Sequence, residues 1–356
     1  MGGSKLTAQV ATYGDLGIAA PSNNPGARYK AAHWTDADGN LWLFGGSAEN
    51  SASPGVTDLN DLWKYSSGEW TWVSGTNIGN QPGKYGTQGM PAPDNLPGAR
   101  TDAAFWTDSV GNMWLFGGYG CDSNSPCGYA NLNDLWKFSG GEWTWMAGSA
   151  TANQSGSYGT LGSAAPGNIP GARADAATWT DLSGNLWLFG GAVYTYPYPT
   201  ESLMSDLWKF SEGEWTWMGG SADTNQPGNS GLLGTPGSNN IPSARSFASG
   251  WTDRSGNFWL FGGFCIVGSD ITFMESCNDL WQYSDGEWTW VAGPPGGDQP
   301  GTYGILGVPS PDVMPGARGD SATWVDSSGN LWLFGGGGYG STSTWGDLND
   351  LWKLEP

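Results

Sequence analysis

An eight-residue segment recurs five times in this chain and constrains its fold more than any other feature. It reads GNLWLFGG at residues 39–46 and returns, with one changed position in two of the copies, at residues 111–118, 184–191, 256–263 and 329–336. Measured from Trp42 onward, the steps between copies are 72, 73, 72 and 73 residues. A period this regular indicates a repeat protein, in which each repeat is one structural unit.

Each repeat predicts four β-strands. In the first repeat these are residues 29–36, 40–44, 62–66 and 70–73, which we term strands a to d. A turn with Asp first and Gly fourth joins strands a and b in every repeat, which is the chemistry of a tight hairpin. Four strands joined in this way form one antiparallel sheet with Trp on both faces. Radial packing of such sheets covers both faces, so we expect an all-β fold of the β-propeller type.

The repeat boundaries predict a single domain over residues 1–356 with five blades, at about 1–72, 73–145, 146–217, 218–290 and 291–356. The last repeat stops after LWKL at residues 351–354, without the EWTW segment that supplies strand d elsewhere. We therefore expect four-stranded blades and a last blade that lacks its outer strand. Two alternatives stay open: the chain is part of a longer array, or a partner chain supplies the missing strand.

The sequence resembles the Kelch repeat family over essentially its whole length. The matching residues of the first repeat are Arg28, the Gly45–Gly46 pair, Trp63 in an Asp-Leu-Trp segment, and Trp70. The resemblance implies a propeller related to the central domain of galactose oxidase. Two features depart from the family: the period exceeds the roughly 50 residues of a Kelch repeat, and the frequent His after the Arg is absent.

Composition excludes several partners. The chain has 33 acidic and 13 basic residues and a net charge of −20, which disfavours binding to a nucleic-acid backbone. No apolar run is long enough to span a bilayer. The 60 glycines lie at fixed repeat positions, so they indicate turns rather than disorder.

The segments between strands b and c diverge strongly, whereas the links from strand d to the next strand a repeat closely. Divergence confined to one loop of a repetitive chain suggests ligand contact, although relaxed constraint on exposed loops gives the same pattern. Aromatic residues favour binding, because they are costly to expose. The predicted ligand residues are Tyr119, Tyr129, Tyr194, Tyr196, Tyr198, Phe264, Phe273, Tyr339 and Trp345.

All four cysteines also lie in these b–c segments. Cys121 and Cys127 fall in the second repeat, and Cys265 and Cys277 in the fourth, so each pair is expected to form a disulfide within its own segment. Disulfides predict an oxidising compartment, extracellular or periplasmic. Zinc is disfavoured, because the spacings lack a paired CxxC form and the chain has one His.

Three acidic residues are the candidate metal ligands. Strand a is expected to lie innermost. On it, two residues after the Arg that begins the strand, lie Asp102, Asp175 and Asp320. A ring of carboxylates there suits calcium or a polar ligand, although each Asp is equally suited to pair with its neighbouring Arg or to face water. No other cofactor is expected.

Known catalytic sets find no match in the sequence. A copper site of the galactose oxidase kind needs two His ligands and Ser-His-Asp catalysis needs a His base, whereas the only His, His33, lies where other repeats have Phe, Thr or Gly. We therefore expect a non-enzymatic propeller that binds a protein or glycan partner through the b–c segments. The alternatives are a structural protein that self-assembles through its incomplete last blade, and a carbohydrate-active enzyme that uses carboxylates.

Overall fold

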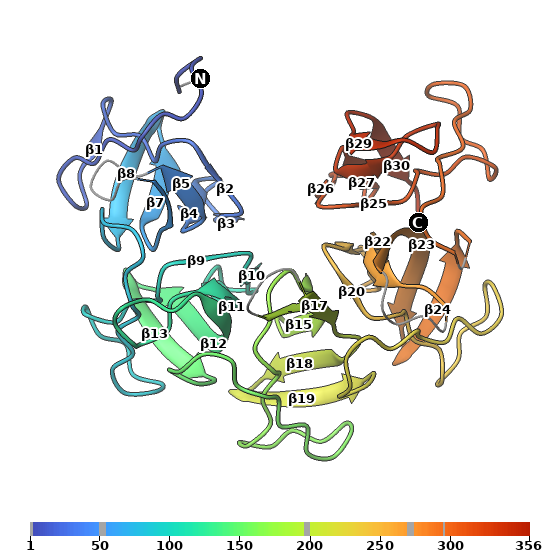
Figure 1. Ribbon diagram of the computed structural model, residues 1–356, viewed down its shortest axis with the longest axis horizontal. Helices are drawn as coiled ribbons and strands as arrows, with labels where there is room; N and C mark the ends of the chain where they lie inside the picture. The colour runs from blue at the N-terminus through green and yellow to red at the C-terminus, as the bar shows by residue number, and fades with distance from the viewer. Residues whose placement is uncertain (1–2, 50–54, 196–199, 269–273, 295) are drawn as a thin grey trace. The chain divides into compact units, whose positions relative to one another are not determined.

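The computed structural model describes residues 3–49, 55–195, 200–268, 274–294 and 296–356, and every regular element in them is a β-strand. They form two compact units. Unit 1 comprises Met1–Gly159, Ala165–Ala174 and Ser211–Trp215, and unit 2 comprises Thr160–Ala164, Asp175–Phe210 and Thr216–Pro356. The sheets of the first two repeats belong to unit 1, and those of the fourth and fifth belong to unit 2 (Figure 1). Among these residues there is no helix of the length and hydropathy that crossing a membrane requires.

The first repeat forms an antiparallel sheet in the order β1-β8-β7-β4-β3. Its strands are β1 (Ala19–Ala20), β3 (Ala32–Thr35), β4 (Leu41–Phe44), β7 (Leu62–Ser66) and β8 (Glu69–Ser74). The register places Trp34 opposite Trp42 and Leu43 opposite Trp63. Cross-strand aromatic pairs of this kind are a main source of sheet stability.

The other repeats form the same sheet. The second uses β10 (Ala104–Thr107), β11 (Met113–Gly120), β12 (Ala130–Ser139) and β13 (Glu142–Ala147). The third uses β14 (Ala177–Thr180), β15 (Leu186–Phe189), β18 (Leu207–Ser211) and β19 (Glu214–Gly219). The fourth uses β21 (Ser249–Thr252), β22 (Phe258–Ile266), β23 (Met274–Ser284) and β24 (Glu287–Ala292). The fifth has three strands, β26 (Ala322–Val325), β27 (Leu331–Phe334) and β30 (Leu351–Leu354), as expected from the missing EWTW segment.

The hydrogen bonds of the a–b turn explain why Asp, Gly-Asn and Trp recur together in every repeat. Asp36 Oδ1 accepts hydrogen bonds from the backbone N–H groups of Asp38 and Asn40, and its Oδ2 accepts one from Trp42 Nε1 at 2.9 Å. The same Trp-to-Asp bond recurs in the other four repeats at 2.9 Å. In the last repeat these bonds, led by the one from Trp332, lower the pKa of Asp326. One carboxylate thus fixes both the turn and the first Trp of strand b.

The b–c segments are β-hairpins rather than irregular loops, which corrects the sequence prediction. In the second and fourth repeats they are continuations of β11–β12 and β22–β23 beyond a bulge at the double glycine. In the other repeats they are separate pairs, β5 (Ser47–Glu49) with β6 (Val56–Asp58), β16 (Ala192–Thr195) with β17 (Thr200–Leu203), and β28 (Gly337–Tyr339) with β29 (Trp345–Asp347). Both glycines of the pair have positive φ, for example 66° at Gly45 and 84° at Gly46, which re-aims the chain out of the sheet.

Strand a is also divided, where the sequence predicted one strand. Short pieces pair with the hairpins, namely β2 (Arg28–Tyr29), β9 (Arg100–Thr101), β20 (Arg245–Ser246) and β25 (Arg318–Gly319). After each piece one residue adopts a left-handed conformation, with φ of 60° at Lys30 and 56° at Asp102. The backbone N–H of Asp102 donates to the Lys30 carbonyl, and in unit 2 Asp320 donates to Phe247 in the same way. The break in strand a therefore ties the second repeat to the first in unit 1, and the fifth repeat to the fourth in unit 2.

A buried polar cluster recurs where the d–a link passes over strand c, and we call it the Arg–Asp–Tyr cluster. In the second repeat Arg100 makes two hydrogen bonds of 2.7 Å to the carboxylate of Asp134. Tyr85 and Trp136 donate to the same carboxylate, at 2.7 and 2.6 Å. Burial raises the pKa of Tyr85 well above its ordinary value. The in-register Tyr, Arg and Asp of the sequence therefore fasten the link to the blade.

Aromatic rings fill the space between neighbouring sheets of one unit. In unit 1 the rings of Phe44 and Trp143 lie 5.3 Å apart, and in unit 2 those of Phe189 and Trp288 lie 5.4 Å apart. Trp143 and Trp288 are 1% and 3% exposed. These pairs join consecutive repeats, so the recurrent Trp residues form the core, as predicted.

Candidate functional site

Two of the predicted ligand residues come together on the hairpin of the second repeat. The rings of Tyr119, on β11, and Tyr129, just before β12, are nearly parallel at 20° with centroids 6.4 Å apart. Tyr129 is 40% exposed and its hydroxyl donates to Asn80 Oδ1 at 2.7 Å. Asn80 in turn accepts from the backbone N–H of Asp58, so Asn80 of the d–a link bridges the hairpins of the first and second repeats.

The other predicted ligand residues that the structure describes belong to unit 2. The Tyr194 hydroxyl donates to Asp175, and the Phe264 ring contacts that of Phe247 at 5.7 Å. Tyr339 pairs with Trp345 across β28 and β29, and Trp345 is 56% exposed. Tyr196, Tyr198 and Phe273 lie outside the described residues.

Two of the three predicted acidic residues have partners other than their neighbouring Arg. Asp102 accepts a hydrogen bond from Lys30 Nζ at 2.8 Å, and Asp175 accepts one from Tyr194. Asp102 belongs to unit 1, while Asp175 and Asp320 belong to unit 2. Within the described ranges no three His, Cys, Asp or Glu residues are gathered as a metal site. Calcium at these residues stays a prediction.

A carboxyl that the sequence reasoning missed lies beside Asp102. Asp58, on β6, is 5% exposed and accepts a hydrogen bond from the Ser47 hydroxyl. Burial is the largest cause that raises the pKa of Asp58, and the Asp102 charge adds to it; although the Ser47 hydrogen bond and Lys30 act in the opposite direction, the pKa rises from 3.8 to about 6. The Asp58 charge also contributes to a raised pKa at Tyr129, after burial as the larger cause. Lys30, Asp58, Asp102 and Tyr129 thus form one group, which we call the Asp58 cluster.

The repeat itself does not require this carboxyl. The positions equivalent to Asp58, two residues before the Asn-Asp-Leu-Trp segment or its equivalent, hold Asn131, Leu203, Ser276 and Asp347. Likewise Asp102 is replaced by Lys30 and Phe247 in other repeats. The available signal was that the residue types at the positions of Asp58 and Asp102 vary between repeats while the backbone there stays the same. This signal was hidden because Asp58 lies in the first repeat and Asp102 in the second.

Replacing Asp58 with Asn is expected to stabilise the protein at neutral pH. Because its folded pKa is raised, the unfolded Asp58 loses its proton first, so wild-type stability falls as pH rises from about 4 to about 6. Asp58→Asn removes this loss and gains about 1–3 kcal/mol at pH 7. Asn131 shows that Asn fits the equivalent site. Urea unfolding at pH 4 and pH 7 measures the effect, and the exposed Asp347→Asn serves as the control with a change below about 0.5 kcal/mol; equal behaviour of both variants contradicts the assignment.

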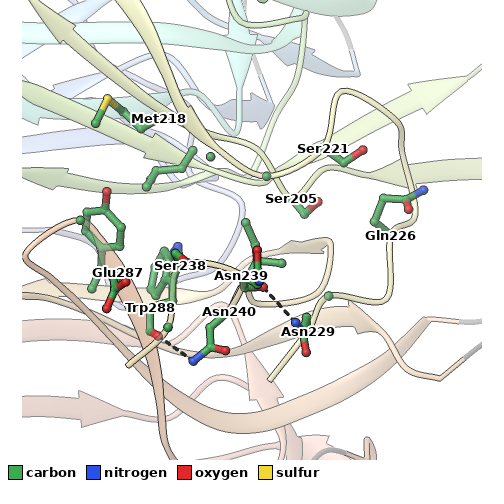
Figure 2. A pocket seen from close by; sticks show the side chains of 18 of the residues that line it. Ser205, Met218, Ser221, Gln226, Asn229, Ser238, Asn239, Asn240, Glu287 and Trp288 are labelled. Carbon is green, nitrogen blue, oxygen red and sulfur yellow. Dashed lines mark hydrogen bonds between the residues drawn. The ribbon is translucent and has the colours of Figure 1, made fainter. Parts of the chain in front are cut away.

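Unit 2 contains a pocket of about 400 Å³ between the third and fourth repeats, within the range of small-molecule sites. Its wall combines Leu207 and Met218 of the third sheet, the link after β19, and Tyr283 and Trp288 of the fourth sheet (Figure 2). Across the link, Asn229 Nδ2 donates to the Asn239 carbonyl at 3.0 Å, and Asn240 Nδ2 donates to the Trp288 carbonyl at 3.0 Å. Sequence reasoning missed this pocket, because it treated the d–a links as uniform.

Both predicted disulfides are present. Cys121 bonds to Cys127 and Cys265 to Cys277. The second bridge joins β22 to β23 rather than closing a loop. Two disulfides are typical of proteins from an oxidising environment, outside the cytosol.

Comparison with known proteins identifies the fold. No protein-family profile and no curated protein sequence matches the chain. Among solved structures it is similar to that of YjhT, with 13% identity and a TM-score of 0.52, over 93% of this chain and 82% of the other. It also matches a fungal alcohol oxidase of the AA5 family in complex with copper, with 14% identity and a TM-score of 0.41, over 88% of this chain and 60% of the oxidase.

The prediction that the chain is not an enzyme is corrected. A fold of this kind hosts enzymes as well as binding proteins, and function resides in sites that the fold alone does not determine. That prediction rested on the absence of the His residues that a copper site or a Ser-His-Asp triad needs. This absence says nothing about catalysis by carboxyl groups such as that of Asp58. What the sheets and the likeness to YjhT establish together is the architecture: the chain has an all-β fold of the β-propeller type.

Proposed function

We propose that the protein is a carbohydrate-active propeller that holds a glycan on the hairpins of its first two repeats. The observation that carries the proposal is the Asp58 cluster, in which the 40% exposed Tyr129 ring lies beside two carboxyl groups and an ammonium group. A flat amphipathic ring suits the apolar face of a sugar, and charged groups form strong hydrogen bonds with hydroxyls. The net charge of −20 favours a neutral or basic ligand.

Glycan-array binding of wild type and Tyr129→Ala tests this proposal. We expect wild type to bind a set of glycans and the variant to bind them about tenfold more weakly or worse. The reason is that loss of a ring contact of about 2 kcal/mol lowers the affinity by more than a factor of ten. Trp345→Ala is the matched control, since Trp345 is also exposed but lies in unit 2. If Trp345→Ala loses glycan binding while Tyr129→Ala binds like wild type, the site lies in the fifth repeat and the proposal is refuted.

The raised pKa of Asp58 favours a second candidate, in which the same cluster hydrolyses the bound glycan. A carboxyl that keeps its proton near pH 6 can donate it to a leaving oxygen, while a second carboxylate acts as base or nucleophile. Asp102 would take that second role. We expect hydrolysis of an array-positive glycan to decline above about pH 6 and to be lost in Asp58→Asn but retained in Asp347→Asn. Glycan binding without hydrolysis at any pH would support the binding function and contradict the hydrolytic one.

A further inference from the structure

In each of the first two repeats an asparagine fastens the two ends of the d–a link. Asn60 Oδ1 accepts from the Thr76 backbone N–H at 3.2 Å, and its Nδ2 donates to the Pro97 carbonyl at 3.2 Å. Asn133 repeats this with Ser149 and Pro170, at 3.1 and 3.2 Å. A side-chain carboxamide therefore fills the space between the start and the end of the link, using one donor and one acceptor.

The third repeat departs from this rule, because Ser205 stands where the others have Asn. The link residues that the carboxamide would join are Ser221 and Pro242. Within the described part of the chain, the Ser205 hydroxyl, the Ser221 N–H and the Pro242 carbonyl form no hydrogen bond. Ser205 and Ser221 both line the pocket of about 400 Å³ (Figure 2). The pocket thus lies where the first two repeats have the carboxamide of Asn60 or Asn133.

The same link lacks a second fastening. Ser230 occupies the position of Tyr85, so the fourth Arg–Asp–Tyr cluster has no tyrosine. The Asp279 side chain is 11% exposed, compared with 0% for Asp134. The link of the third repeat, which lines the pocket, therefore lacks both the asparagine and the tyrosine that fasten the link of the first repeat.

The pocket wall indicates the kind of ligand. It contains the acidic Glu287 and, in the part that the structure describes, no Lys or Arg, so it offers an anion no counter-charge. Leu207, Met218 and Ile241 supply apolar contacts next to the polar groups. The complement of this wall is a neutral group with an N–H, a carbonyl and a small alkyl substituent.

We infer that this pocket binds an acetamido group, as carried by an N-acetylhexosamine. The ligand N–H would donate to the Ser205 hydroxyl oxygen, the ligand carbonyl would accept from the Ser221 N–H, and the ligand methyl group would contact Leu207 and Met218, all of which line the pocket. The site is separate from the Asp58 cluster, and the inference stands even if the hairpins bind no glycan.

Titration calorimetry with N-acetylglucosamine, glucosamine and glucose tests the inference on the full chain. We expect N-acetylglucosamine to bind at one site and the two sugars without an acetyl group to bind at least about tenfold more weakly, since each would leave the Ser205 hydroxyl and the Ser221 N–H unpaired. Equal binding of all three sugars, or no binding of N-acetylglucosamine, would overturn the inference. An N-acetylated dipeptide amide is the parallel probe; if it alone binds, the assignment to a sugar is wrong.

Three variants locate the binding. Ser205→Asn should fill the site with the carboxamide of the other repeats, abolish binding and raise the melting temperature, so its effect is not a folding failure. Ser221→Pro removes the N–H donor, and Pro294 shows that the equivalent position of the next link accepts proline; we expect weaker binding with the pocket retained. Asn60→Ser should open a second site and raise the stoichiometry from one to two.

The hairpin variant separates this site from the proposed function. Tyr129→Ala should leave N-acetylglucosamine binding unchanged. If Tyr129→Ala removes that binding while Ser205→Asn keeps it, the sugar lies on the hairpins and the pocket inference fails.

Discussion

Arg100→Met is expected to lower the free energy of unfolding by about 3–5 kcal/mol, because it leaves the carboxylate of Asp134 buried without its counter-charge. Arg100 and Asp134 are both fully buried as side chains, and the guanidinium also donates to the Gly117 carbonyl. Tyr85 and Trp136 still donate to Asp134 in the variant, but neither carries a positive charge. Chemical denaturation followed by tryptophan fluorescence measures the change.

Two companion variants make this result specific. Lys353→Met breaks an ion pair with Glu355 whose side chains are 37% and 60% exposed, and we expect a cost of about 0–1 kcal/mol. Adding Asp134→Asn to Arg100→Met removes the stranded charge and should recover part of the loss. A small effect of Arg100→Met, comparable to that of Lys353→Met, would contradict a role for the Arg–Asp–Tyr cluster in fastening the link.

Trp106→Ala is expected to cost about 3–5 kcal/mol, since it removes a whole ring from a closely packed interior. Trp106 is 3% exposed, and its carbonyl accepts from Trp34 Nε1 of the first repeat at 2.8 Å. The backbone bond survives the substitution, so the loss reports ring packing between sheets.

Trp324 occupies the same register position in the fifth repeat and provides the matched comparison. It is 43% exposed, so Trp324→Ala should cost clearly less than Trp106→Ala, roughly three-fifths as much if the cost scales with the buried area. Melting temperatures of the two variants measured side by side test this. Equal losses would show that the fifth sheet is covered in solution by a surface that the described residues do not provide.

Much of the scaffold could be predicted from the sequence, because the repeat shows the same residues under the same constraint five times. Asp36, Asn40 and Trp42 recur together since one carboxylate binds the other two. The break in strand a was missed, because Lys30, Asp102 and Phe247 share no side-chain property that marks a left-handed backbone. The hairpins were taken for loops because their sequences vary while their pairing does not.

The candidate sites were harder to predict, because they arise from departures between repeats rather than from a motif. Tyr119, Tyr129 and Asp102 were named in the sequence, but their proximity to Asp58 depends on how two repeats pack. Ser205 and Ser230 each look like ordinary link residues. Only the bonds of Asn60 and Tyr85 show what the two serines lack.

The central claim is that departures from the repeat mark the sites at which this propeller meets carbohydrate. A glycan array with wild type, Tyr129→Ala and Ser205→Asn tests it most directly. We predict that wild type retains glycans and that each variant loses a different subset, with N-acetylhexosamine-terminated glycans lost in Ser205→Asn. Glycan profiles of both variants identical to wild type, or no retained glycan for any of the three proteins, would contradict the account.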